Sequence, residues 1–129
     1  ESTDSNLPDQ YSNLITVEIL TSEGSVRVSG TYLRGTTHLV RVREEWMDAE
    51  LDVPYLLFID HFDQPGLIGL VGSITGKHDI NIAFMAVGRQ EVRGRAMMVV
   101  GLDDPMPDSV LAEIRAVPEI EVARVVRLA

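Results

Sequence analysis

An α+β fold is predicted by two features of the sequence: the order of elements after residue 54 and the absence of helical periodicity before it. Between residues 55 and 128, strand-length apolar runs and amphipathic segments follow one another as strand, helix, strand, strand, helix, strand. Before residue 54, only short segments of alternating apolar and polar residues occur. A βαββαβ order within about 75 residues is typical of the ferredoxin-like arrangement. We therefore expect a ferredoxin-like unit preceded by a short antiparallel β meander.

The composition of the 129 residues excludes several classes of function. Hydrophobic residues make up 45% of the chain, enough for a packed core in one domain, or in one small domain plus part of another. The net charge of −9 repels phosphate backbones, so nucleic acid is not expected as a partner. The absence of cysteine excludes disulfides, thiolate metal sites and iron–sulfur clusters, and it fits a reducing cytoplasm. The apolar runs are strand-length and carry charges, so no membrane span is expected.

Three regions are predicted along the chain. Residues 1–13 are polar and aperiodic, which indicates a loop or tail. Residues 14–53 contain three strands joined by turns and end in an acidic segment, 44–52, that we do not assign to a strand. A meander this small needs support, so we expect it to belong to a larger sheet. Pro54 favours an extended junction, which places the ferredoxin-like unit at 54–129.

The helices and strands of the second half are expected at defined positions. The first helix should begin at Pro65, where a missing N–H is harmless, and end near residue 78. Its buried stripe should comprise Leu67, Leu70, Val71 and Ile74. The remaining elements are expected as strands at 55–62, 80–88, 96–102 and 120–128, and as a second helix from Pro107 to Pro118 that buries Val110, Leu111, Ile114 and Val117.

The predicted sheet has apolar residues on both faces. Right-handed crossovers place both helices on one face of the sheet, which leaves the other face uncovered. The pairs Leu56–Leu57 and Met97–Met98 each put one apolar side chain on each face. A monomer would therefore expose a large apolar patch, and we expect a homodimer or a higher homo-oligomer.

A possible small-molecule site surrounds the corner after the first of these strands. His61 ends the strand, Asp63 begins the turn, and Asn81 opens the next strand. The N–H groups of Gly66, Leu67 and Ile68 would lie at the helix start, which favours a carboxylate. Asp63 can pair with an ammonium group, and His61 and Asn81 can hydrogen-bond a hydroxyl or a carboxylate. Together they match a free amino acid.

The same residues allow a purely structural interpretation. Asp63 could cap the helix, and Asn81 could serve the turn before its strand. The crossover helix also returns the chain to the opposite end of the sheet, so Asn81 would reach the corner only from an adjoining copy.

Other candidate sites are less specific. No metal-ligand spacing, nucleophile elbow or dinucleotide-binding glycine pattern occurs, so neither catalytic residues nor a metal site is expected. Arg89, Arg93 and Arg95 are interpreted as a solvated turn. A possible anion site in the meander, against the alternative of a solvent-exposed strand face, would use Arg34, His38, Arg41 and Arg43.

Four motifs carry a resemblance to a known family: D-x-P-G, I-N-I-x-x-M-x-V-G-R, A-M-M-V-V and P-D-x-V-L. As a set they resemble the C-terminal ACT domain of D-3-phosphoglycerate dehydrogenases. The preceding part, N-L-I-T-V-E-I to V-R-V, resembles the end of the intervening (allosteric substrate-binding) domain of the longer forms of that enzyme.

The resemblance implies a regulatory role. Domains of this family pair side by side and bind an effector amino acid between copies, L-serine in the dehydrogenases. The effector ligands carry over to His61, Asp63 and Asn81. The resemblance implies that NAD is held by other domains of such an enzyme, and no cofactor is expected in this chain. Two alternatives remain: the ACT-containing β component of an iron–sulfur L-serine dehydratase, and an amino-acid sensor or oligomerisation module without an enzyme.

Overall fold

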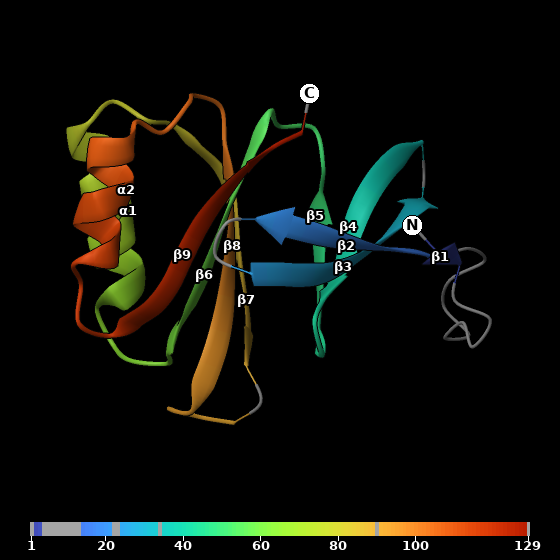
Figure 1. Cartoon of the computed structure of the whole chain (residues 1–129), viewed down its shortest axis with the longest axis horizontal. Helices are drawn as coiled ribbons and strands as arrows, with labels where there is room; N and C mark the ends of the chain where they lie inside the picture. Colours follow the sequence, from blue (N-terminus) through green and yellow to red (C-terminus); the bar gives the residue numbers. More distant parts are fainter. Residues whose placement is uncertain (1, 4–13, 22–23, 34, 90, 129) are drawn as a thin grey trace. The chain divides into compact units, whose positions relative to one another are not determined.

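The computed structural model describes residues 2–3, 14–21, 24–33, 35–89 and 91–128. Arg34 and most of the predicted tail at 1–13 lie outside the described residues. The chain divides into two compact units, residues 1–52 and 53–129, and each is described here by itself (Figure 1).

The first unit is an antiparallel sheet of five strands in the order β1-β2-β3-β4-β5. The predicted meander is confirmed in its three central strands. Two further strands correct the prediction, because β1 lies in the expected tail and β5 lies in the acidic segment. Their bounds are β1 (Ser2–Thr3), β2 (Ile15–Thr21), β3 (Gly24–Leu33), β4 (Thr36–Val42) and β5 (Glu45–Glu50).

The two strands that sequence reasoning missed lie at the edges of the sheet. β1 pairs through only two residues, which is too short to leave a periodic pattern. β5 consists of Glu-Trp-Met-Asp-Ala-Glu, which lacks β-branched residues, and only Ala49 in it is buried. A tight turn at Arg43, whose φ is +52°, brings β5 back beside β4. Strand formation here depends on an available neighbour more than on local propensity.

The second unit is a sheet of four strands covered by two helices. The strand order is β7-β8-β6-β9, and every neighbouring pair is antiparallel. Figure 1 shows α1 and α2 side by side on the same face of this sheet. This is the predicted ferredoxin-like arrangement. Its elements are β6 (Tyr55–Phe62), α1 (Leu67–Lys77), β7 (Ile82–Arg89), β8 (Arg95–Leu102), α2 (Asp108–Arg115) and β9 (Ile120–Arg127).

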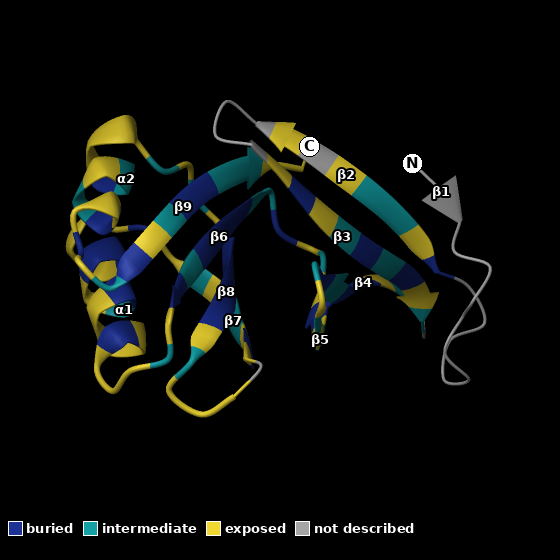
Figure 2. Ribbon diagram, turned by 60° about the horizontal axis from the view of Figure 1, so that its bottom comes forward, coloured by how far each residue is buried: buried dark blue, intermediate teal, exposed yellow. Residues whose placement is uncertain are grey.

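The core of the second unit lies between the sheet and the helices. From the helices it contains Val71, Ile74 and Ile114, and from the sheet Ile59 and Met98. Figure 2 shows the complementary pattern, with exposed residues along the outer sides of α1 and α2. Leu56, Phe58, Met97 and Val99 alternate with the core residues of β6 and β8 and so point to the other face of the sheet. All four are buried in the single chain, so the expected exposure of apolar residues on this face is wrong at these positions. The homo-oligomer stays a prediction.

The start and the stripe of α1 differ in detail from the prediction. Gly66 has a left-handed φ of +88°, so the helix begins after it, at Leu67, and Pro65 precedes the helix. Leu70 is 41% exposed, whereas Thr75 is buried. At 100° per residue, Thr75 falls within the buried stripe and Leu70 falls at its margin. The Thr75 hydroxyl is accommodated by donating to the carbonyls of Val71 and Gly72.

The longest helix among the described residues has 11 residues. No described helix combines the length and the apolar character needed to cross a bilayer.

Candidate functional site

The corner between β6 and α1 leaves the first turn of the helix without a side-chain cap. The N-cap residue is Gly66, which has no side chain and therefore no side-chain acceptor, and the first turn contains no acidic residue. Asp63 is therefore not the helix cap that the structural alternative required. The N–H groups at the start of α1 favour a negatively charged group nearby.

His61 presents a buried acceptor at this corner. The residue is only 2% exposed, and its Nδ1 lies 2.8 Å from the carbonyl oxygen of Phe62. Because a carbonyl only accepts, Nδ1 carries the proton, and Nε2 of the neutral ring is an acceptor. Among the residues that the structure describes, none donates to this Nε2, although it is fully buried. A buried polar atom without a partner is costly, which makes this nitrogen a candidate for a donor from outside the chain. His61 itself is not among the residues that line the hollow described below.

Asp63 is tied to the loop between β7 and β8. Its Oδ2 accepts hydrogen bonds from Nη1 of Arg89 at 2.8 Å and from the backbone N–H of Arg93 at 3.0 Å. Its own backbone N–H donates to the carbonyl of Gly94 at 2.8 Å. The hydrogen bond from Arg89, followed by that from the Arg93 backbone, lowers the pKa of the Asp63 carboxyl. Asp63 is thus ionised and already paired.

A hollow of about 370 Å³ lies between this corner and the loop. Arginine, aspartate and the helix start all contribute to its wall. The lining residues are Asp63, Gln64, Pro65, Gly66, Ile68, Arg89, Val92 and Arg93.

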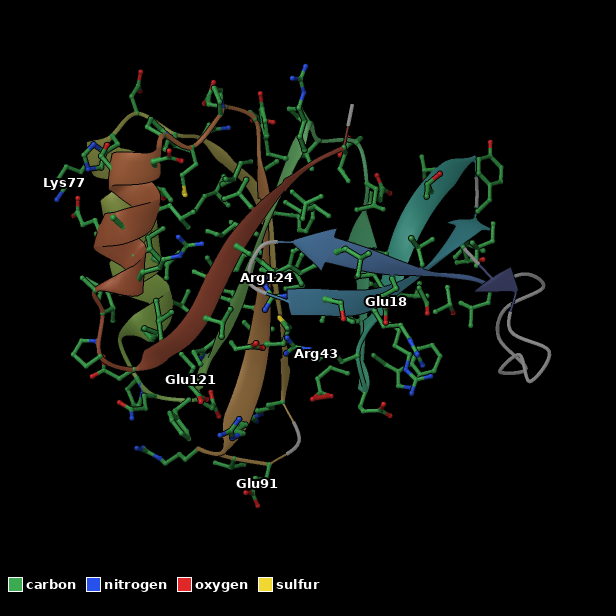
Figure 3. All side chains as sticks on the ribbon, in the orientation of Figure 1. Glu18, Arg43, Lys77, Glu91, Glu121 and Arg124 are labelled. Atoms are coloured by element: carbon green, nitrogen blue, oxygen red, sulfur yellow. The ribbon has the colours of Figure 1, made fainter. Side chains whose placement is uncertain are left out.

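Asn81 lies at the opposite end of the same sheet. His61 pairs with Ala96 at the start of β8, whereas Ile82 pairs with Leu102 at its end. Six residues of strand separate these positions by roughly 20 Å. Figure 3 shows the two ends: Glu91 and Glu121 lie at the end of the corner, and Lys77 lies at the other. One chain therefore brings together His61 and Asp63 but not Asn81.

Asn81 has its own partners at that end. Its side-chain Nδ2 donates to Asp103 at 2.6 Å, and its backbone N–H donates to Asp104 at 2.9 Å. The amide oxygen of Asn81 has no hydrogen bond from any described residue, so it stays available as an acceptor.

Sequence reasoning missed the role of Arg89 and Arg93 at the corner. Both were interpreted as part of a solvated turn, yet both donate to Asp63. A signal for Arg89 was nevertheless present, because Arg89 ends β7. β7 lies next to β8, and β8 in turn pairs with β6, the strand that leads into the corner.

Two residues of the possible anion site in the first unit, His38 and Arg41, are paired with acidic groups. His38 is buried, with Nδ1 2.6 Å from Asp48 and Nε2 2.8 Å from the hydroxyl of Thr36. Arg41 donates to Glu44 at 3.0 Å, and its guanidinium lies 4.9 Å from the centre of the Trp46 ring. Arg43 donates its backbone N–H to Arg27. Binding of an anion by this group stays a prediction.

Comparison with known proteins identifies the second unit. The ACT domain family matches residues 55–119. This chain belongs to the ACT domain family. The match begins with β6 and includes both helices, so the corner at His61 and the hollow beside it are features of an ACT domain.

The relatives of this ACT-domain chain include several D-3-phosphoglycerate dehydrogenases. The enzyme of Synechocystis sp. is 51% identical over 74 residues, which is 57% of this chain and 13% of the relative. The enzyme of Bacillus subtilis is 34% identical over 121 residues, which is 92% of this chain and 22% of the relative. The second match therefore extends into the first unit, and the chain spans less than a quarter of either enzyme.

One further relative belongs to another enzyme. A probable L-serine dehydratase β chain of Bacillus subtilis is 30% identical over 64 residues, which is 50% of this chain and 29% of the relative.

Proposed function

We propose that this chain is the regulatory, amino-acid-binding part of a D-3-phosphoglycerate dehydrogenase and that L-serine is its effector. The observation that carries the proposal is the buried Nε2 of His61, which has no donor among the described residues. It adjoins a corner whose helix start has no side-chain cap. A serine hydroxyl or ammonium group would supply the missing donor.

A second copy of the chain would complete the pocket. β7 is an edge strand of the four-stranded sheet, and a two-fold axis pairs an edge strand with itself in antiparallel fashion. Such pairing sets the Asn81 end of one β7 beside the Arg89 end of the other. Asn81 of the second copy would then reach the Asp63 corner. Pairing through β9, the opposite edge, would leave Asn81 far from it.

Catalysis and cofactor binding belong to other parts of such an enzyme. No residue of this chain is assigned to NAD, and the chain's role is to sense the product amino acid. The match to the dehydratase β chain supports one alternative parent, in which the same pocket would serve an iron–sulfur enzyme. A module that only oligomerises is the alternative without a ligand.

Titration calorimetry with L-serine tests the proposal. We expect saturable heat in the wild-type chain and none in His61→Phe, which fills the space but removes the acceptor. The matched control is His78→Phe, because His78 lies at the other end of α1 and pairs with Glu113. It should bind like the wild type. A stable dimer that gives neither heat nor a thermal shift at millimolar L-serine would exclude the ligand and leave the oligomerisation module.

A further inference from the structure

We infer that Asp63 and Arg89 together clamp the charged head group of a free α-amino acid, with Arg89 binding the carboxylate and Asp63 the ammonium group. This inference rests on the proposed function and deepens it, because it names the residue that selects the ligand class. Arg89 is outside the set His61, Asp63 and Asn81.

The hydrogen bonds of Asp63 leave one of its oxygens available. Arg89 and the backbone of Arg93 both donate to Oδ2. No described residue donates to Oδ1. The carboxyl is ionised, since the arginine lowers its pKa. Oδ1 can therefore accept from an ammonium group without displacing the arginine.

Arg89 likewise keeps donors for a ligand. A guanidinium has five N–H donors in a planar fork, and the contact to Asp63 uses Nη1 alone. The side chain is half exposed and lines the hollow together with Asp63. The remaining N–H groups match the geometry of a carboxylate, which the N–H groups at the start of α1 would also favour.

The pair thus presents adjacent opposite charges, 2.8 Å apart at their closest atoms, to one hollow. In an α-amino acid the ammonium and carboxylate groups are attached to the same carbon, so both charges can be matched at once. A simple amine would pair only with Asp63, and a simple carboxylate would pair only with Arg89. In either case the other side chain would have no partner on the ligand. The clamp therefore selects zwitterions over amines and monoanions.

Arg93 acts as a positioning residue for the clamp. Its φ of +60° is uncommon for a residue with a side chain, and this conformation points its backbone N–H at Oδ2 of Asp63. With Oδ2 held by two donors, Oδ1 is the oxygen that remains for the ligand.

The test compares two ligands on two proteins. L-serine and L-serinamide differ in the carboxylate, and the wild-type chain is compared with Arg89→Gln by calorimetry. We expect Arg89→Gln to weaken L-serine roughly ten- to a hundredfold, because a charge-assisted hydrogen bond is lost. L-serinamide should bind the variant as well as the wild type or better, because Asp63 is released from Arg89.

Two further variants control for charge and folding. Arg95→Gln removes the same charge from the same hairpin, but Arg95 pairs with Glu121 and does not line the hollow. It should leave L-serine binding unchanged. Arg89→Lys keeps the charge and loses the planar fork, so it should give an intermediate affinity for L-serine.

The outcomes separate the clamp from the proposed function. If L-serine binds and Arg89→Gln weakens both ligands equally or neither, the clamp is overturned and the serine site stands. If glycine or L-alanine binds in place of L-serine and Arg89→Gln impairs that binding, the clamp stands and the serine assignment fails. If none of the three amino acids binds the wild-type chain, both fail.

Discussion

The two ends of the four-stranded sheet use opposite chemistry. At the corner, the carboxylate of Asp63 is surrounded by donors from Arg89 and Arg93. At the far end, the amide of Asn81 is surrounded by acceptors from Asp103 and Asp104. One chain holds them roughly 20 Å apart. A second copy related by a two-fold axis would run in the opposite direction, so the acceptor-rich end of one chain would lie beside the donor-rich end of the other.

The two ends also differ in how many of their polar atoms already have hydrogen-bond partners. His61 keeps a buried acceptor for which the described residues provide no donor. Asn81, by contrast, already uses its backbone N–H and one of its two side-chain N–H donors, so its amide oxygen and the second side-chain N–H are left for a ligand. The corner is therefore the end where a ligand would gain most, and Asn81 of a second copy would supply the contact that completes the pocket.

Complementation between variants should have the largest effect. Asp63→Ala and Asn81→Ala should each lose detectable L-serine binding, because each spoils both pockets of a dimer. In a heterodimer of the two variants, one pocket keeps both residues. An equal, re-equilibrated mixture should therefore recover about a quarter of the wild-type sites, as counted by calorimetric stoichiometry. If the mixture bound no more L-serine than either variant alone, the pocket would have to be formed within one chain.

Substitutions of two glycines near the corner should differ in sign. Gly66→Ala forces a side chain into φ +88° and should lower the free energy of unfolding by about 1–2 kcal/mol. Gly72→Ala lies inside α1 with nothing within 4 Å of the added methyl, so it should raise that free energy by about 1 kcal/mol. Chemical denaturation of the monomer measures both.

The second glycine also reports on the partner. If Gly72 faces a close second copy, Gly72→Ala should weaken dimerisation, and analytical ultracentrifugation would detect the loss. An unchanged dimer would mean that this side of α1 faces solvent in the assembly.

The smallest expected effect concerns two carboxyl groups near the two ends of α1. Arg89 lowers the pKa of Asp63, and Lys77, followed by His78, lowers that of Glu113. Arg89→Gln should raise the pKa of Asp63 alone, and Lys77→Gln that of Glu113 alone. Carbon-detected NMR titration measures both. If one variant changed the pKa of both Asp63 and Glu113, the two carboxyl groups would not titrate independently and the prediction would be wrong.

The direction of the stability change with pH follows from these shifts. Because each folded pKa lies below the ordinary value, each carboxyl stabilises the fold above its ordinary pKa. That contribution is lost as the pH falls through the lowered pKa. In Arg89→Gln the contribution of Asp63 should diminish.

The elements of the second unit were predictable because their patterns are local. The apolar run of β6 and the spacing of Val71 and Ile74 specify a strand and a helix within a few residues. β5 was missed because its sequence has little strand propensity and forms a strand only beside β4.

The contact between Asp63 and Arg89 was not predictable in the same way. The two residues are 26 positions apart, and their contact depends on the loop conformation at Arg93, where φ is +60°. A positive φ at an arginine leaves no mark in the sequence, unlike one at a glycine. Residue types thus indicated the corner, and only the fold showed how its charges are paired.

The two ends of the ACT-domain unit lie beside each other. The backbone N–H of Leu128 donates to the carbonyl of Pro54 at 2.8 Å, and Tyr55 pairs with Arg127. The first and the last strand of the unit therefore begin and end next to each other. A unit of this kind can be joined to a host protein, or placed between two of its segments, without changing the distance between them. The geometry makes such a unit transferable between host proteins.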